Sequence, residues 1–439
     1  MIEDIKILED KFGFLTVSMN PQMAEQLGLK YAKDRFIKFG MKTSHVKIVI
    51  DKEVNKKELQ ISGDLLTKLQ LFTHLRYDLK VINDEIRIGP FIGILAKKKE
   101  GNLKDSLEKL KVYARHYKKI RGCLIVFSLQ GINDSAFTIK GYMYNPDTKT
   151  WTEGTFQYPD VIFPKIVLTQ KWSEHFQTML RGGLFNKKAL TKWEVHEYLS
   201  QFDEINQYLP NTLLYKDYNQ LLQFLMVYRC AYMKPITGFK GRKVSKLTYI
   251  DDGIKLETVE NKKSESTFIK NPAKFFHSNF KKNSYIIQPC LNLNILNDRV
   301  VDFRLTIDKD KKGAWKVIGF VGRQGQSGSV VSNRSSGGKV EMGEAILRQA
   351  FNISTEELDD LEKNMKTLAV MVAEMLDTSS LHFGKLAIDL GIDQDKRLWI
   401  IEVNNRYPND EIMVFAGKPD LYEELKLTNL LYAKKLAGF

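Results

Sequence analysis

The C-terminal part of the chain is organised around one stretch, Leu398-Trp-Ile-Ile-Glu-Val-Asn-Asn405. Its five apolar residues predict a buried strand. That strand would deliver a carboxylate, Glu402, and two amides to one end of a sheet. The stretch therefore combines a core-forming pattern with polar groups that a core alone does not require.

A second strand of the same kind lies just upstream, in Leu386-Ala-Ile-Asp-Leu-Gly-Ile-Asp393, and carries Asp389. The short charged tract Asp395-Lys-Arg397 between the two strands is typical of a hairpin turn. Adjacent antiparallel strands would bring Asp389, Glu402 and Asn404 together. Oxygen ligands from two carboxylates and one amide suit Mg²⁺. The alternative is a buried hairpin whose acidic residues merely reach solvent.

Composition sets the broad class of the protein. The chain has 439 residues, of which 43% are hydrophobic and 27% charged, which indicates a globular protein of two or three domains. We expect no membrane span and no signal peptide, because no run of eighteen apolar residues occurs and the N-terminus is charged. The three cysteines, Cys123, Cys230 and Cys290, lack CxxC spacing. They favour a reduced, cytoplasmic protein over a disulfide scaffold or a zinc site.

The formal net charge of +14 is compatible with nucleic acid, an anionic membrane or small anionic ligands. The lysines are spread along the chain, and no basic run alternates with aromatic residues as in a strand-binding groove. The clusters at 97–99 and 309–316 fall in expected turns, where solvated charge explains them. The sequence therefore does not favour specific nucleic-acid binding.

The pattern of expected elements changes along the chain. Residues 1–84 predict a small β-rich unit, with a helix marked by Asn20, Pro21 and a following Gly28. From residue 85 the order becomes strand, helix over 103–120, and strand, which predicts a parallel sheet. The chemical candidates lie beyond residue 172.

Two lysines in this third region are candidates for binding phosphate. Lys192 begins an expected helix, and Lys234 ends an expected strand at Pro235. A basic loop with two glycines, at 237–246, follows Lys234. A lysine at a strand end beside a loop of backbone N–H groups can hold phosphates. The spacing is not that of a Walker A loop, and an ordinary basic β-turn is the alternative.

Two arginines lie on strands between the lysines and the hairpin. Asp302 and Arg304 share one face of a strand because they are two residues apart, and Arg323 ends the next strand. A loop rich in Gly, Ser and Asn follows. Arginines near a metal site would suit a phosphorylated intermediate. A surface salt bridge is the alternative for either arginine.

The order of these pieces resembles the ATP-grasp superfamily, and most closely its YheC/YheD endospore coat-associated family. The stretches that carry the resemblance are Ile88-Gly-Pro-Phe-Ile-Gly-Ile-Leu, Lys192-Trp-Glu, Leu209-Pro-Asn-Thr, Met233-Lys-Pro, Asp302-Phe-Arg, Gly337-Gly, Ile388-Asp-Leu-Gly-Ile-Asp and Ile401-Glu-Val-Asn. No single motif is specific to this superfamily, whereas the ordered set of motifs is.

The resemblance implies a role for each candidate residue. ATP would be bound by the two lysines, a flap and a hinge, through Lys192, Lys234, Gly238, Lys240, Gly241, Gln288, Pro289, Cys290 and Leu291. Mg²⁺ would be held by Asp389, Glu402 and Asn404, and the acyl phosphate would be steadied by the catalytic residues Arg304 and Arg323. The substrate would be contacted by Asp302, Asn333, Gly337, Gly338 and Arg406. The hinge departs from many superfamily members, which carry a Glu where this chain has Gln288.

The resemblance also implies the fold. We expect an α+β and α/β protein with an ATP-grasp domain at 172–439, in which two α+β subdomains clasp ATP and the flap lies in 209–290. A β-rich accessory domain at 1–84 and an α/β pre-ATP-grasp domain at 85–171 would precede it.

The implied function is an ATP- and Mg²⁺-dependent carboxylate–amine ligase that forms an amide through an acyl phosphate. Its substrates would be an amino acid and a peptide or another small acidic molecule, and a homo-oligomer is compatible with the resemblance. The alternative is a structural spore-envelope protein that binds nucleotide without turnover. We expect a cytoplasmic location, with the spore envelope implied by the family.

Overall fold

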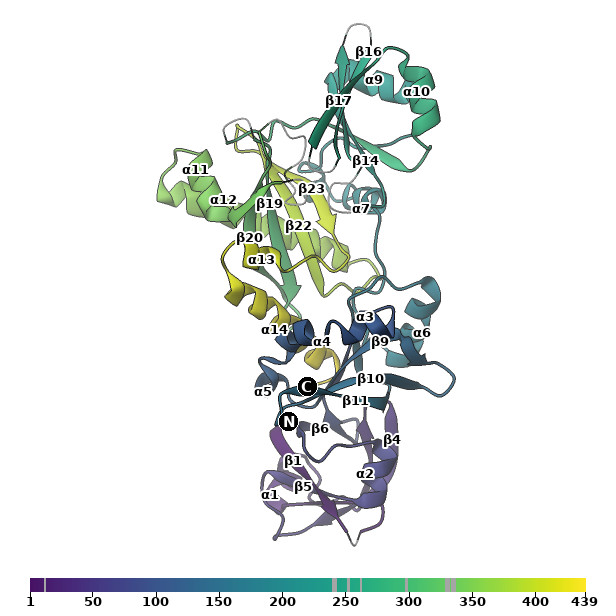
Figure 1. Cartoon of the computed structure of the whole chain (residues 1–439). Helices are drawn as coiled ribbons and strands as arrows, with labels where there is room; N and C mark the ends of the chain where they lie inside the picture. Colours follow the sequence, from purple (N-terminus) through teal and green to yellow (C-terminus); the bar gives the residue numbers. More distant parts are fainter. Residues whose placement is uncertain are drawn as a thin grey trace. The chain divides into compact units, whose positions relative to one another are not determined.

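The computed structural model describes residues 1–11, 13–238, 243–250, 253–260, 263–296, 299–327, 332 and 337–439. The chain forms two compact units (Figure 1). The first unit comprises residues 1–188, 309–314 and 426–439, and the second comprises residues 189–308 and 315–425. Within the described residues, no helix is both long and apolar enough to cross a membrane.

The first unit opens with a closed barrel of strand order β1-β5-β2-β4-β3-β7-β6. Its elements are β1 (Ile2–Asp10), β2 (Thr16–Met19), α1 (Pro21–Gln26), β3 (Asp34–Phe39), β4 (Lys42–Ile50), β5 (Glu58–Ser62), α2 (Gly63–Leu69), β6 (Arg76–Ile82) and β7 (Glu85–Gly89). The helix predicted after Asn20 is confirmed, because the Asn20 side chain accepts the Gln22 N–H at 2.9 Å and Pro21 occupies the first turn.

A mixed sheet of order β11-β10-β9-β8-β12 follows in the same unit. Its strands are β8 (Phe91–Lys97), β9 (Cys123–Asn133), β10 (Thr138–Asn145), β11 (Thr150–Gln157) and β12 (Val161–Pro164), and helix α6 (Gln170–Leu180) comes after them. β8 pairs in parallel with both β9 and β12, which confirms the predicted parallel pairing. β10 and β11 extend the sheet with antiparallel pairs.

The single helix predicted over 103–120 is wrong. This region forms four short pieces, α3 (Glu100–Lys104), α4 (Leu107–Leu110), a 3-10 turn η1 (Lys111–Ala114) and α5 (Tyr117–Ile120). The first break has a local cause, because the Ser106 hydroxyl donates to the Asn102 carbonyl at 2.8 Å and competes with the backbone. Val112, Tyr113 and Tyr117 are buried and have low helix propensity.

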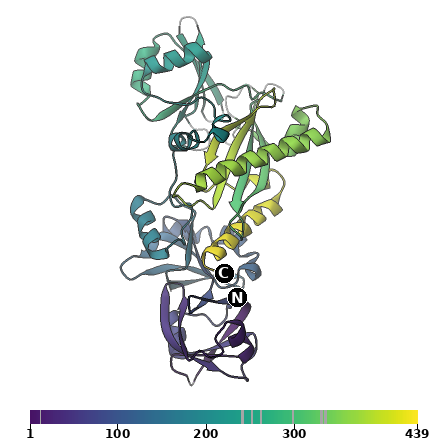
Figure 2. The same ribbon diagram turned by 180° about the vertical axis from the view of Figure 1, so that it is seen from behind.

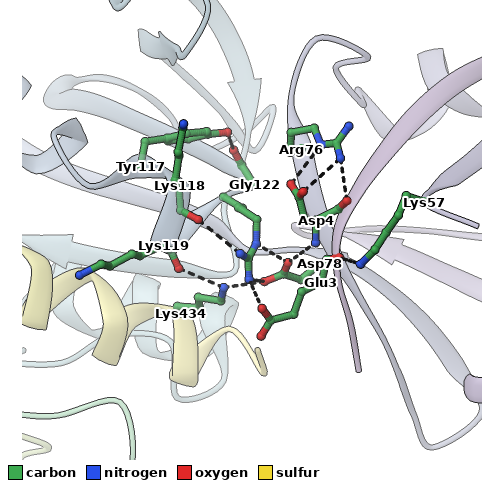
Figure 3. A network of polar contacts seen from close by, with 11 residues as sticks. Glu3, Asp4, Lys57, Arg76, Asp78, Tyr117, Lys118, Lys119, Gly122 and Lys434 are labelled. Carbon is green, nitrogen blue, oxygen red and sulfur yellow. Dashed lines mark hydrogen bonds and ion pairs between the residues drawn. The ribbon is translucent and has the colours of Figure 1, made fainter.

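A buried ion-pair network ties the C-terminal helix into the first unit (Figure 3). Asp78 on β6 is fully buried. Its carboxylate accepts the Arg121 Nε–H at 2.6 Å, the Lys434 ammonium at 2.5 Å and the Asp4 backbone N–H at 3.0 Å. Lys434 lies on helix α14 (Pro419–Leu436). One carboxylate thus joins two strands of the barrel, the turn after α5 and the end of the chain.

The second unit contains a sheet of order β13-β18-β14-β15-β16-β17. Its elements are β13 (Leu213–Leu214), α9 (Tyr218–Tyr228), β14 (Cys230–Pro235), β15 (Ser245–Ile250), β16 (Gly253–Glu260), β17 (Lys263–Ile269), α10 (Pro272–Asn279) and β18 (Tyr285–Pro289). Helices α9 and α10 bury their apolar side chains against one face, where Leu225, Phe276, Met233 and Ile287 share a core. These two helices do not cover the opposite face of the sheet.

A second sheet of this unit has the order β21-β20-β19-β22-β23. The elements around it are α7 (Lys192–Leu199), α8 (Asp203–Asn206), β19 (Val301–Lys309), β20 (Trp315–Gln324), β21 (Lys339–Met342), α11 (Gly343–Ala350), α12 (Thr355–Asp377), β22 (Lys385–Ile392), β23 (Leu398–Asn404) and α13 (Ile412–Phe415). The long helix α12 covers one face of the sheet (Figure 2). It begins at a capping box in which Ser354 accepts the Glu357 N–H at 3.1 Å.

Candidate functional site

The predicted hairpin is confirmed as β22 and β23, which pair in antiparallel. Asp389 lies directly opposite Glu402, and Ala387 lies opposite Asn404. The register shifts after Asp389, so that Ile401 is the extra residue of a bulge. Because paired and alternate residues share a face, the two acids and Asn404 project to the same side. The Asn404 amide N–H donates to the Asp389 carboxylate at 3.2 Å.

Two arginines engage the Asp389 carboxylate. Arg304 on β19 is its cross-strand neighbour and binds it through Nε and Nη2, both at 2.7 Å. Arg323 at the end of β20 donates to Asp389 at 2.8 Å and to Asp302 at 2.6 Å. Burial alone would raise the pKa of Asp389, but the charges of Arg304 and Arg323 outweigh it and hold that pKa at about 2. Asp389 is therefore ionised at neutral pH.

Lys192 connects the acidic hairpin to the first sheet of this unit. Its ammonium group lies 3.0 Å from Glu402 and donates to the Gly238 carbonyl at 3.3 Å. Its backbone N–H donates to the Ile236 carbonyl at 3.0 Å. Lys192 is the first residue of α7, whose start is fixed by a capping box at Thr191. This cap holds the lysine at the edge of the site.

Asn405 is a functional candidate that the sequence did not reveal. Its buried amide accepts the Leu190 N–H at 2.8 Å and donates to the Leu190 carbonyl at 3.2 Å. Leu190 precedes Lys192 by two residues, so Asn405 clamps the segment that carries the lysine. The only hint in the sequence was that Asn405 directly follows Asn404. Because side chains alternate along a strand, the Asn405 amide lies on the face opposite Asn404, away from the predicted metal ligands.

Lys234 lies on the face of its sheet opposite helices α9 and α10. Its ammonium group donates to the Gln288 Oε1 at 2.7 Å, and Gln288 donates onward to the Thr212 hydroxyl at 2.9 Å. Loss of water around the ammonium group lowers the pKa of Lys234 to about 8, although the nearby charge of Glu402 acts in the opposite direction. Thr212 was missed in the sequence, where a lone threonine carries no signal.

The depressed pKa of Lys234 predicts a pH dependence of stability. An unfolded lysine titrates near pH 10.4, so between about pH 8 and pH 10 the unfolded chain binds more protons than the folded chain. The free energy of unfolding should rise with pH in this window and fall again as the pH returns to 8. Urea unfolding at several pH values should show this rise in the wild type and a smaller one in Lys234→Met. Equal slopes for the two proteins would contradict the shift.

An apolar pocket adjoins these charges. Four polar residues line it, Lys192, His196, Gln288 and Glu402, and its other lining residues, such as Leu209, are aliphatic. The remaining lining residues are Val195, Leu199, Ile286, Ile400, Ile401 and Val403. Burial lowers the pKa of His196, which favours its neutral form. A mainly aliphatic lining thus lies directly beside the Lys192–Glu402 pair of charges.

The expectation that all cysteines are reduced is wrong. Cys230 and Cys290 form a disulfide, with their Cα atoms 5.4 Å apart, and Cys123 is buried and free. Antiparallel pairing of β14 with β18 sets Ala231 opposite Pro289, which places the two cysteines side by side just beyond that pair. The pairing depends on a register between strands 60 residues apart in sequence, which spacing motifs do not reveal.

Reduction of this disulfide should destabilise the protein. Opening a cross-link that closes a loop of 60 residues should lower the free energy of unfolding by about 4 kcal/mol in the chain-entropy account. Urea unfolding with and without dithiothreitol measures the change. The Cys290→Ser variant should behave as the reduced wild type and ignore the reductant. A wild type that unfolds identically in both conditions would contradict the cross-link.

The other predicted site residues are placed as follows. Gly337 and Gly338 precede β21, and Gly337 has a φ of +91°, a conformation that favours glycine. Arg406 is exposed directly after Asn405. Lys240, Gly241 and Asn333 lie outside the described residues.

The donors available for a metal ion are two carboxylates and one amide. Among the described residues, no group of three or more His, Cys, Asp or Glu side chains is arranged to hold a metal. Asp389, Glu402 and Asn404 instead offer hard oxygen atoms on one face of the hairpin, which suits Mg²⁺. Both oxygens of Asp389 accept from arginine here, so Glu402 and Asn404 are the less engaged donors.

Comparison with known proteins agrees with this architecture. The profile of the YheC/D-like ATP-grasp family matches residues 182–436. The chain is 24% identical to the endospore coat-associated protein YheD of Bacillus subtilis (strain 168), over 88% of this chain and 86% of YheD. It is 23% identical to YheC of the same strain, over 69% of this chain and 84% of YheC.

Among solved structures, the ATP-grasp ligase PsnB, determined with a precursor variant, Mg and ADP, gives a TM-score of 0.44 at 14% identity. That match covers 79% of this chain and 99% of PsnB. The family resemblance and the ATP-grasp fold expected from the sequence are confirmed. The profile covers more than half of the residues, and the chain therefore belongs to the YheC/D-like ATP-grasp family.

Proposed function

We propose that the protein is an ATP- and Mg²⁺-dependent carboxylate–amine ligase. The observation that carries the proposal is the meeting of Lys192 and Lys234 with Glu402 beside an apolar pocket. Cations supplied by helix α7 and by strand β14 flank a cluster of hard oxygen donors. Such an arrangement suits a polyphosphate and its metal, because both the phosphate charge and the metal are matched.

The nucleotide would lie across the apolar pocket. Lys192 and Lys234 would contact the phosphates, with Gly238 in the segment that leads into the flap. Adenine would lie against Gln288 and the hinge residues that follow it, Pro289, Cys290 and Leu291. The disulfide at Cys290 ties this hinge to β14. A hinge fixed in this way would present its backbone groups to the base without further ordering.

Asp389, Glu402 and Asn404 would hold Mg²⁺. When bound, the ion would offset the negative charge of the phosphates as a carboxylate approaches the γ-phosphate. The Lys192–Glu402 pair holds the Glu402 carboxylate directed at the same space. Asn405 would act as a positioning residue, because it holds the segment before Lys192 against the hairpin.

Arg304 and Arg323 would have different roles. The Arg304 side chain is 15% exposed and that of Arg323 is 5% exposed. Arg304 is thus the better placed of the two to reach an acyl phosphate, whereas Arg323 mainly holds Asp302 and Asp389 in position. Arg406, which is exposed, and the Gly337–Gly338 segment would face the carboxylate or amine substrate. Cationic side chains here favour an acidic amino acid or peptide.

Trapping of the acyl phosphate tests the proposal. The protein is incubated with Mg-ATP, hydroxylamine and pools of amino acids or acidic peptides, and hydroxamate and ADP are measured. A ligase should give equal amounts of both products, only with pools that contain its carboxylate. Omission of Mg²⁺ or ATP should abolish both signals.

A second function is suggested by the names of the relatives, both described as endospore coat-associated. In this alternative the protein is a structural component of the spore envelope that keeps nucleotide binding without turnover. Tight ATP binding with neither hydroxamate nor ADP on any pool would favour it over the ligase.

A further inference from the structure

The positive charge of the chain is concentrated in residues 209–290. This segment holds fourteen lysines and arginines against six acidic residues, and so supplies more than half of the net charge of +14. Of these cations, the nucleotide site described above uses Lys234, and the family resemblance adds Lys240. The remaining charge therefore needs a separate explanation.

Part of this charge lines an open groove beside helices α9 and α10. Its basic residues are Lys216, Lys274, His277, Lys281 and Lys282, all of them exposed. None of the four lysines forms an ion pair with a carboxylate in the described part of the chain. These ammonium groups are thus available to a partner from solution.

The one acidic residue of the groove, Asp217, is already engaged. Its carboxylate accepts the Gln220 N–H at 2.9 Å and caps α9. The lysine-bearing turn is also fixed, because the Asn283 N–H donates to the Tyr215 carbonyl at 2.8 Å and the Tyr215 N–H donates to the Tyr285 carbonyl at 2.9 Å. The rim of the groove is held in place by backbone hydrogen bonds, so ordering the rim on binding would cost little conformational entropy.

The groove is distinct from the nucleotide site. Helices α9 and α10 pack on the face of the sheet that carries Met233 and Ile287. Strand alternation sends their neighbours Lys234 and Gln288 to the opposite face. A ligand in the groove would leave the Lys192–Glu402 region open.

The aromatic residues of the groove indicate which anion fits. Tyr218 stacks on Phe276 with ring centroids 6.0 Å apart, and Phe280 packs on Phe276 at 5.0 Å. Rings that pack on one another do not offer free faces to bases, as single-strand binding requires. Lysines around a mainly apolar floor suit carboxylates carried on aliphatic side-chain stems, as in a run of glutamates. We propose that this groove binds an acidic peptide segment, independently of nucleotide and of turnover.

The test measures binding in the absence of ATP. A fluorescein-labelled oligo-glutamate peptide is titrated with the full-length protein at low salt, and anisotropy gives the dissociation constant. The combined variant Lys274→Gln, Lys281→Gln, Lys282→Gln should bind the peptide about tenfold more weakly. It loses three exposed lysine–glutamate ion pairs, each of which contributes only modestly to the affinity. The control variant Lys52→Gln, Lys56→Gln, Lys68→Gln removes the same charge from exposed positions of the barrel and should bind as the wild type.

Two further measurements keep the proposal open to refutation. Photo-crosslinking of a benzophenone-labelled oligo-glutamate peptide to the wild type should mark residues 273–282. Equal losses in both variants, or cross-links elsewhere, would overturn the groove as the site. Tighter binding of a single-stranded DNA of matched charge would overturn the peptide as its occupant. Since no nucleotide is present, failure here would leave the ligase proposal untouched.

Discussion

Replacement of Glu402 by glutamine should lower carboxylate-dependent ADP release by about 10³-fold. Two arginines already bind the Asp389 carboxylate, whereas within the described residues the Glu402 carboxylate pairs with Lys192, so its charge is the one left for a metal. Glutamine keeps the size of the side chain but removes that charge. Lys192 would also lose its partner, and its ammonium group would no longer be directed at the same point.

The fold should survive this change, because the Glu402 side chain is 29% exposed and contributes little to the core. Glu374→Gln, on the exposed face of α12, is the matched control and should leave ADP release unchanged. Steady-state release of ADP and thermal unfolding should be measured on all three proteins. A Glu402→Gln protein that turns over at the rate of the control would remove Glu402 from the site.

A large loss of stability is expected from the single substitution Asp78→Asn. This change leaves Arg121 and Lys434 without the carboxylate that both of them share in the interior (Figure 3). Loss of one partner from a buried ion pair costs about 3–5 kcal/mol, because the remaining charges stay desolvated. Urea unfolding should show this loss in the free energy of unfolding.

Asp4→Asn provides the control in the same network. Asp4 pairs with Arg76 at 3.0 Å, but its side chain is 53% exposed, and exposed pairs contribute about 0–1 kcal/mol. The two variants remove the same charge from neighbouring positions and differ mainly in burial. Equal losses in both would show that Asp78 does not act as a buried anchor.

The sequence was most informative where strand patterns end in polar residues. The alternation in 386–404 was enough to predict the hairpin and the side on which Asp389, Glu402 and Asn404 lie. Asn20 and Pro21 marked a helix start in the same way. These features are local, so their physical causes are contained in a few adjacent residues.

Features that depend on distant partners were not predictable in this way. The Cys230–Cys290 disulfide follows from the register of β14 with β18, and the Asn405 clamp follows from the return of the chain to Leu190. The engagement of Asp389 by Arg304 depends on a cross-strand pair 85 residues apart. Each contact is set by tertiary structure rather than by spacing along the chain.

The most direct measurement is a crystal structure of the protein with Mn²⁺ and a non-hydrolysable ATP analogue, with the anomalous signal of the metal recorded. The account predicts a metal peak bound by oxygens of Asp389, Glu402 and Asn404 and by the phosphates, with Lys192 and Lys234 on the same phosphate chain. A nucleotide bound elsewhere, or these three side chains directed away from the metal, would contradict the account.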